Sequence, residues 1–87
     1  MTVQIFFIYA ENCEHCTEAL DKIESAISKC KKIPCEIKKF SYDSPVAISI
    51  AINRKINDLP GIVIGEKTFV KHCSEEEIIE AIKKAAN

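Results

Sequence analysis

The hydrophobic periodicity of the first forty residues is the feature that most constrains the fold. Residues 3–10 are apolar on both faces, as in a central strand covered by helices on two sides. From about residue 16 to residue 31 the apolar residues recur at helical spacing, and residues 33–38 then alternate as a half-exposed strand does. This order predicts two parallel strands joined by a right-handed crossover.

The second half of the chain carries the signals of a helix, a hairpin and a last helix. A Ser-Pro pair at 44–45 predicts a helix start, and that helix is expected to end near residues 54–55. A Gly-Glu pair at 65–66 separates two short apolar runs, which predicts a two-residue hairpin turn. Ser74 with Glu77 three residues on forms a capping box before the last helix. The predicted order is β-α-β-α-β-β-α.

Composition and length favour a single small globular domain that spans residues 1–87. The hydrophobic fraction of 47% suits a packed core, and the formal net charge of -1 gives no electrostatic reason to expect nucleic acid or an acidic membrane as partner. No apolar stretch approaches the roughly 20 residues that span a bilayer. The apolar run at 3–10 lacks the basic region and the cleavage site of a signal peptide, so we expect a cytoplasmic protein, and a monomer.

Two cysteines stand where the first strand gives way to the first helix, in the segment Cys13-Glu14-His15-Cys16. Backbone N–H groups and the positive end of the helix dipole stabilise a thiolate at such a place. We expect Cys13 to attack a substrate disulfide and Cys16, one turn inside on the same side, to resolve the mixed disulfide. His15 can add positive charge beside the thiolate, whereas Glu14 opposes it.

The same pair of cysteines could instead be half of a zinc site or a structural disulfide. Zinc normally takes four ligands, and only the adjacent His72 and Cys73 could supply more, although they are not a spaced pair. Five cysteines at irregular spacing also do not match a secreted disulfide scaffold. A single C-x-x-C that opens the helix of a βαβ unit favours redox chemistry, and no metal ligand is predicted.

Two stretches of the chain resemble the thioredoxin-like superfamily. The sequence Tyr-Ala-Glu-Asn-Cys-Glu-His-Cys at 9–16 is similar to the thioredoxin active-site stretch, and Ile-Asn-Asp-Leu-Pro at 56–60 is similar to the segment that ends in the cis-proline of that family. The resemblance implies an α/β fold of the compact thioredoxin type, with a four-stranded mixed sheet flanked by helices. It also implies that Cys13 is the nucleophile, Cys16 the resolving thiol and Pro60 the cis-proline beside them. Leu59 would then pair through its backbone with a bound substrate strand, next to Tyr9.

Three positions depart from the patterns of the family. Thioredoxins bury an acid six residues before the first cysteine, and Phe7 stands at that place here. Glutaredoxins carry a glycine pair after the last strand, where backbone approaches glutathione, and residues 71–72 here are Lys-His. The histidine before the second cysteine is similar to that of protein disulfide isomerase. The resemblance therefore predicts the fold, but it does not decide between the thioredoxin and the glutaredoxin subfamily.

The remaining cysteines each allow more than one interpretation. Cys30 and Cys35 lie on apolar faces, which favours buried thiols that act as small hydrophobes, but five residues apart across a turn they could form a second disulfide. Cys73 could be a structural thiol, a site of glutathionylation or a ligand contact. His72 is expected at the surface. The isoleucine-rich stripe at 46–52 is expected in the core, with some positions left for a contact surface.

Together these observations favour a thiol–disulfide oxidoreductase of the thioredoxin or glutaredoxin type, which reduces disulfide-containing proteins and transfers electrons without a bound cofactor. A thioredoxin-type reductase or glutathione would be the electron donor. Two alternatives stay open: a thioredoxin-like binding module that holds a metal or an iron–sulfur cluster through Cys13, and a glutathione-dependent glutaredoxin. A metal-free protein with an oxidisable cysteine pair favours the enzyme, whereas visible absorbance at the cysteines favours the binding module.

Overall fold

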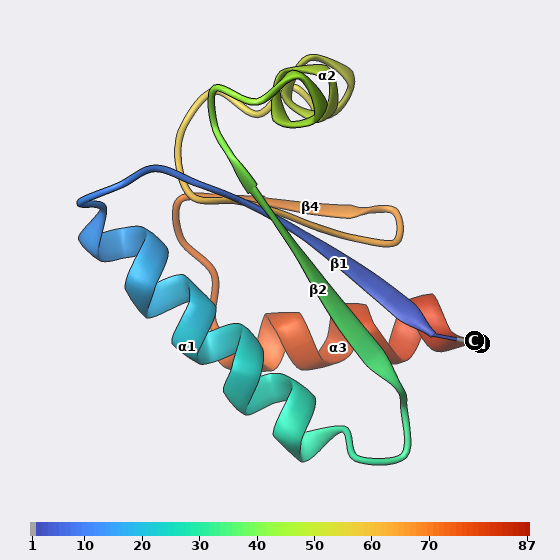
Figure 1. Cartoon of the computed structure of the whole chain (residues 1–87). Helices are drawn as coiled ribbons and strands as arrows, with labels where there is room; N and C mark the ends of the chain where they lie inside the picture. The colour runs from blue at the N-terminus through green and yellow to red at the C-terminus, as the bar shows by residue number, and fades with distance from the viewer. Residues whose placement is uncertain (1) are drawn as a thin grey trace.

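Four strands form one mixed sheet, with three helices packed on its two faces (Figure 1). A computed structural model describes residues 2–87. The elements follow one another as β1 (Val3–Tyr9), α1 (Glu14–Lys29), β2 (Cys35–Ser41), α2 (Pro45–Arg54), β3 (Gly61–Ile64), β4 (Lys67–Val70) and α3 (Glu75–Ala86). The strand order is β2-β1-β3-β4, with β1 parallel to β2 and the other two pairs antiparallel. The predicted element order and the predicted mixed sheet are confirmed.

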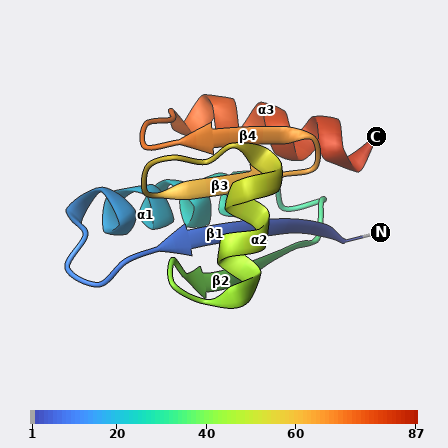
Figure 2. The ribbon, with the colours of Figure 1, turned by 90° about the horizontal axis from the view of Figure 1, so that it is seen from above.

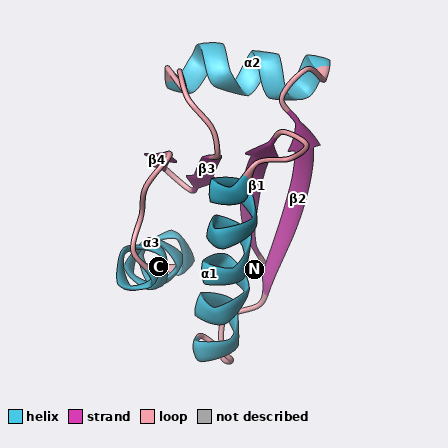
Figure 3. Ribbon diagram, turned by 90° about the vertical axis from the view of Figure 1, so that its left-hand side faces the viewer, coloured by secondary structure: helices cyan, strands magenta, loops and turns pink. Residues whose placement is uncertain are grey.

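The sheet separates two unequal layers of helix. Figure 2 shows α2 crossing over the strands on one face, and Figure 3 shows α1 and α3 side by side on the other. Strand β1 lies inside the sheet between β2 and β3, which explains why its residues are apolar on both faces. In the described part of the chain, no helix is both long enough and apolar enough to cross a membrane.

Most of the core lies between the sheet and the pair α1 and α3. Ile5, Ile23 and Ile78 come from three different elements and have no exposed surface. The layer under α2 is thinner, because Ala47 is the only residue of that helix that is fully buried. The prediction that the stripe at 46–52 lies in the core is wrong in large part, since Val46, Ile48 and Ile52 are 48%, 48% and 73% exposed. A single small residue at the contact lets the helix lie close to the sheet, and its larger side chains then point sideways and outward.

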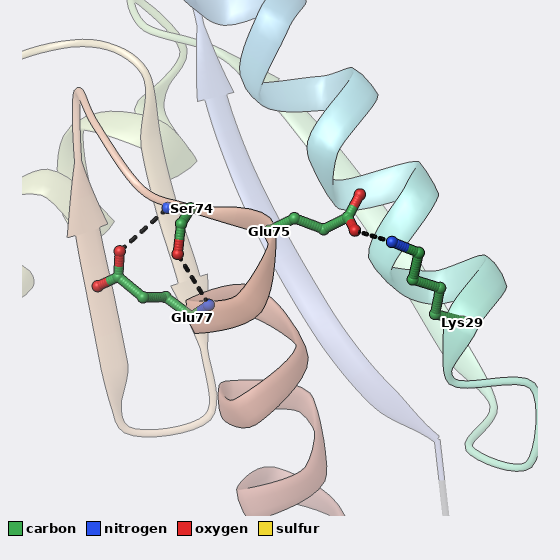
Figure 4. A network of polar contacts seen from close by, with 4 residues as sticks. All are labelled: Lys29, Ser74, Glu75 and Glu77. Atoms are coloured by element: carbon green, nitrogen blue, oxygen red, sulfur yellow. Dashed lines mark hydrogen bonds and ion pairs between the residues drawn. The ribbon is translucent and has the colours of Figure 1, made fainter.

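The start of α3 is fixed by polar contacts that Figure 4 shows. Ser74 Oγ accepts the backbone N–H of Glu77 at 3.1 Å, and Glu77 Oε1 accepts the N–H of Ser74 at 3.0 Å, so the predicted capping box is confirmed. These hydrogen bonds hold the pKa of Glu77 below its usual value. Glu75 pairs with Lys29 at the end of α1, and the hydrogen bond from Lys29 is the main cause that lowers the pKa of Glu75. The same contacts therefore join the end of α1 to the start of α3.

Candidate redox site

The turn after β1 places Cys13 at the N-cap of α1. Asn12 has a φ of 57°, a left-handed conformation that asparagine tolerates better than most residues, and the chain reverses there before the helix begins. Cys13 itself is extended, with φ -107° and ψ 106°. Its Sγ accepts the backbone N–H of Cys16 at 3.1 Å, as the side-chain oxygen of an N-cap serine would. The sulfur thus lies at the positive end of the helix dipole.

Cys13 and Cys16 form a disulfide, with their Cα atoms 5.2 Å apart. The two sulfurs differ in access, because Cys13 is half-buried whereas Cys16 is 4% exposed and belongs to the core under α1. The neighbouring residues of the motif, Glu14 and His15, are both exposed on the first turn of the helix. An incoming disulfide can therefore reach Cys13 directly, whereas Cys16 lies in the first turn of α1 and is buried.

The segment before β3 lies at the same end of the sheet as the disulfide. The last pair of the antiparallel β1–β3 ladder joins Ile8 to Gly61, so Tyr9, which ends β1, and Pro60, which immediately precedes β3, lie at the same end of the sheet. Figures 1 and 2 show the loop before α1, the loop before β3 and the loop after β4 gathered there. The Leu59–Pro60 peptide bond is cis, the isomer that the sequence predicts.

The backbone of Leu59 is only partly free for a substrate strand. Its N–H donates to Asp58 Oδ1 at 2.8 Å, whereas the resemblance implied that both polar groups of this residue would face a partner. Asp58 also lies near Lys71 Nζ, at 3.7 Å, and the backbone N–H of Lys71 donates to the carbonyl of Pro60 at 2.9 Å. The segments 58–60 and 70–72 are therefore tied together beside the cysteines.

One contact at this end was not foreseen. The imidazole rings of His15 and His72 meet edge to face, with centroids 5.5 Å apart and planes at 83°. His72 is exposed, as predicted, but it is not an isolated surface residue. The only signal in the sequence was that His72 stands in the segment after the last strand, where related proteins place groups that approach a ligand.

The comparisons with known proteins address the fold. No family model matches the chain, and no curated protein matches it. Solved structures do match. A thioredoxin-like protein from Clostridium perfringens has a TM-score of 0.77 and 11% identity, over 97% of this chain and 71% of that one. Thioredoxin-2 of the malaria parasite has a TM-score of 0.65 and 23% identity, over 95% and 82%. Thioredoxin 1 from Thermosipho africanus has a TM-score of 0.62 and 21% identity, over 93% and 91%.

The chain has a thioredoxin-like fold. These structures are thioredoxins or thioredoxin-like proteins, and the matches span 93–97% of this chain, which confirms the fold that the two sequence stretches implied. At these identities the likeness shows the fold alone and assigns no role to individual side chains.

A hollow of about 620 Å³ opens beside the disulfide of this thioredoxin-like domain. Phe7 and Tyr9 of β1 line it, with ring centroids 6.1 Å apart, and so does Lys39, which pairs with Phe7 in the β1–β2 register. Cys13, Glu14 and Cys16 complete the side next to the helix. Phe7 is 2% exposed, so at position 7 an aromatic ring and not a carboxylate forms the wall of the hollow.

The other three cysteines are free thiols within the described residues 2–87. Cys30 and Cys73 are buried in the main core, and the thiol of Cys35 donates to the carbonyl of Ile33 at 3.4 Å. Burial raises the pKa of Cys35, and the neighbouring Cys30 raises it further. Burial likewise raises the pKa of Cys73, although Lys22 acts in the opposite direction. The interpretation of these residues as small hydrophobes is favoured over a second disulfide.

No group of three or more His, Cys, Asp or Glu side chains in the described chain is placed to hold a metal ion.

Proposed function

We propose that this protein is a thiol–disulfide oxidoreductase that reduces protein disulfides by dithiol exchange through Cys13 and Cys16. The observation that carries the proposal is the asymmetry of the pair: Cys13 Sγ is accessible and accepts a backbone N–H at the helix start, and it is bonded to a buried Cys16. A hydrogen bond donor and a helix dipole stabilise a thiolate on the outer sulfur, which is the sulfur that a substrate can reach.

The exchange consists of two displacements at sulfur. The Cys13 thiolate attacks one sulfur of the substrate disulfide, so that a mixed disulfide forms and the other substrate sulfur leaves as a thiolate that takes a proton from water. Cys16, deprotonated, then attacks Cys13 Sγ. The Cys13–Cys16 disulfide forms, and the second substrate sulfur leaves as a thiol. The dithiol loses two electrons and the substrate disulfide gains them.

Substrate binding is assigned to the surface around the cis-proline. Leu59 offers its backbone carbonyl to an extended substrate strand, and its N–H becomes a second partner when the Asp58 carboxylate moves away. Tyr9 ends β1 and Pro60 immediately precedes β3, so both lie at the same end of the sheet. A strand that adds here brings its disulfide to the exposed side of Cys13. The proposed substrates are therefore extended segments of proteins that contain a disulfide.

The electron donor proposed is a protein reductase rather than glutathione. Lys71 and His72 put side chains where a glutaredoxin has glycines, and only glycine allows a ligand that close to the backbone. Lys71 Nζ lies near Asp58 and can also pair with a carboxylate of glutathione, which is the argument for the alternative. A protein that reduces disulfides suits a reducing compartment, and the compartment that we propose is the cytoplasm.

The function is tested by the reduction of insulin with dithiothreitol, followed by turbidity. The wild-type protein should accelerate the reaction at micromolar concentration, and Cys13→Ser should fall to the rate of buffer alone. Cys35→Ser changes a free, half-buried thiol outside the motif, and it is the matched control that keeps full activity. Equal rates for the wild type and Cys13→Ser would refute the proposal. The donor is tested separately: oxidised protein is given either glutathione with glutathione reductase, or thioredoxin reductase with NADPH. Faster reduction by glutathione would assign the protein to the glutaredoxin type.

A further inference from the structure

The segment after β4 brings His72 onto the first turn of α1. His72 lies two residues after the end of β4, and His15 lies between the two cysteines of the motif. Their rings meet edge to face at 5.5 Å, although the two residues are far apart in the sequence. Aromatic rings favour this edge-to-face arrangement. Among the described residues, no other pair of aromatic rings joins this loop to the cysteine motif.

The backbone of this loop is held in a rarely populated conformation. Lys71 has a φ of 68°, and the N–H of His72 donates to the carbonyl of Val70 at 2.8 Å. A hydrogen bond from residue i+2 to residue i around a central residue with positive φ is a γ-turn of the strained type. Non-glycine residues keep such a conformation only where their surroundings impose it.

Two contacts from the cis-proline segment impose the turn. The N–H of Lys71 donates to the carbonyl of Pro60 at 2.9 Å, and the Lys71 ammonium lies 3.7 Å from Asp58 Oδ2. Residues 58–60 therefore hold Lys71, and the turn at Lys71 sets the direction of His72. A third contact ties the segment to α1, because Lys22 Nζ donates to the carbonyl of Cys73 at 3.1 Å, directly after His72.

We propose that His72 is a positioning residue that fixes the imidazole of His15 beside the redox cysteines, a role that rests on the proposed dithiol function. His15 is exposed on the first helical turn, so its side chain would otherwise occupy several rotamers. The ring of His72 selects the rotamer in which the two imidazoles touch. A protonated imidazole is a cation and a hydrogen-bond donor, and such a group held near Cys13 favours its thiolate against the opposing charge of Glu14.

A double-mutant cycle on the alkylation rate tests this coupling. The fully reduced wild type, His15→Ala, His72→Ala and the double variant are treated with iodoacetamide at neutral pH, and labelling of Cys13 is followed by peptide mass spectrometry. We expect His72→Ala to slow labelling of Cys13 about threefold, the size expected for a coupled pair in contact. In the His15→Ala background the same change should have no effect, because His72 acts through His15. His72→Phe keeps a ring in place and should restore most of the rate.

Two results would overturn the assignment: an equal slowing by His72→Ala in both backgrounds, or no slowing in either. Both histidines are exposed, so the variants should fold, and thermal unfolding provides the check. Alkylation requires only a reduced Cys13, whereas insulin reduction requires the complete exchange. A wild type that reduces no disulfide but shows the coupling would refute the proposed function and leave the role of His72. An active wild type without the coupling would support the proposed function and refute the role of His72.

Discussion

Five cysteines in one small domain occupy two kinds of environment, and the comparison explains which of them can react. Cys13 lies at the start of α1, half-buried, with its sulfur accepting a backbone N–H. Cys30 and Cys73 lie in the core at 5% and 9% exposure, and burial raises the pKa of Cys73. The residue type is the same in both places. Position relative to a helix end and to solvent therefore decides between a nucleophile and a small hydrophobe.

Cys16 stands between these two environments. It is 4% exposed like the structural cysteines, yet it is bonded to Cys13 and shares its helix start. The pair thus combines one accessible sulfur with one protected sulfur. In the proposed exchange, this difference makes Cys13 the sulfur that meets the substrate and Cys16 the sulfur that resolves the mixed disulfide.

The largest expected effect concerns the order of labelling. In the fully reduced protein at neutral pH, Cys13 should react with iodoacetamide about 20-fold or more faster than Cys30 or Cys73, because it has both a stabilised thiolate and access to solvent. A short pulse of reagent, a quench in denaturant with a second reagent and peptide mapping give the rate for each residue. Preferential labelling of Cys16, or of Cys73, would contradict the comparison.

The second effect concerns the stability of the structural cysteines. Cys30→Ser places a hydroxyl in the core, and we expect it to lower the free energy of unfolding by about 1–3 kcal/mol. Cys13→Ser should change it by no more than about 0.5 kcal/mol under reducing conditions, because serine is a good N-cap residue and the site is half-buried. Urea unfolding of both variants with an excess of reductant measures the two values. Equal losses would remove the distinction between the environments.

The smallest effect is a dependence of stability on alkaline pH. Burial raises the pKa of Cys73 above its ordinary value of 9.0, so from about that pH upward the unfolded chain releases this proton more readily than the folded protein. The contribution of Cys73 to stability is complete below pH 9 and is lost as the pH rises toward the pKa in the folded state. Cys73→Ala should therefore flatten the decline of unfolding free energy as the pH rises above 9.0, the ordinary pKa of the thiol. An unchanged slope would show that the thiol is not protected.

Much of this architecture can be predicted from the sequence. The change from an apolar run to a helical stripe to an alternating strand defined the β1–α1–β2 unit, and the serine caps at 44 and 74 defined the starts of α2 and α3. Gly65 allowed the hairpin turn to be placed, and its φ of 59° shows the conformation that requires glycine. These signals are local, which is why they can be read without coordinates.

The parts that could not be predicted depend on contacts between distant segments. Ile48 and Ile52 are apolar enough for a core, but the way α2 crosses the sheet decides that they are exposed. The pairing of His15 with His72 depends on a γ-turn and on the cis-proline segment that holds it. The hydrogen bond from the Leu59 N–H to Asp58 is an exception, because it joins adjacent residues and depends on the local backbone conformation.

Trapping of a mixed disulfide tests the central account most directly. Cys16→Ser and Cys13→Ser, each fully reduced, are incubated with a protein that carries a disulfide, quenched with acid and examined by mass spectrometry without reductant. The account predicts that Cys16→Ser accumulates a covalent adduct joined through Cys13 and released by dithiothreitol, whereas Cys13→Ser accumulates none. An adduct on Cys13→Ser through Cys16, or the absence of any adduct on Cys16→Ser, would contradict the assignment of Cys13 as the nucleophile.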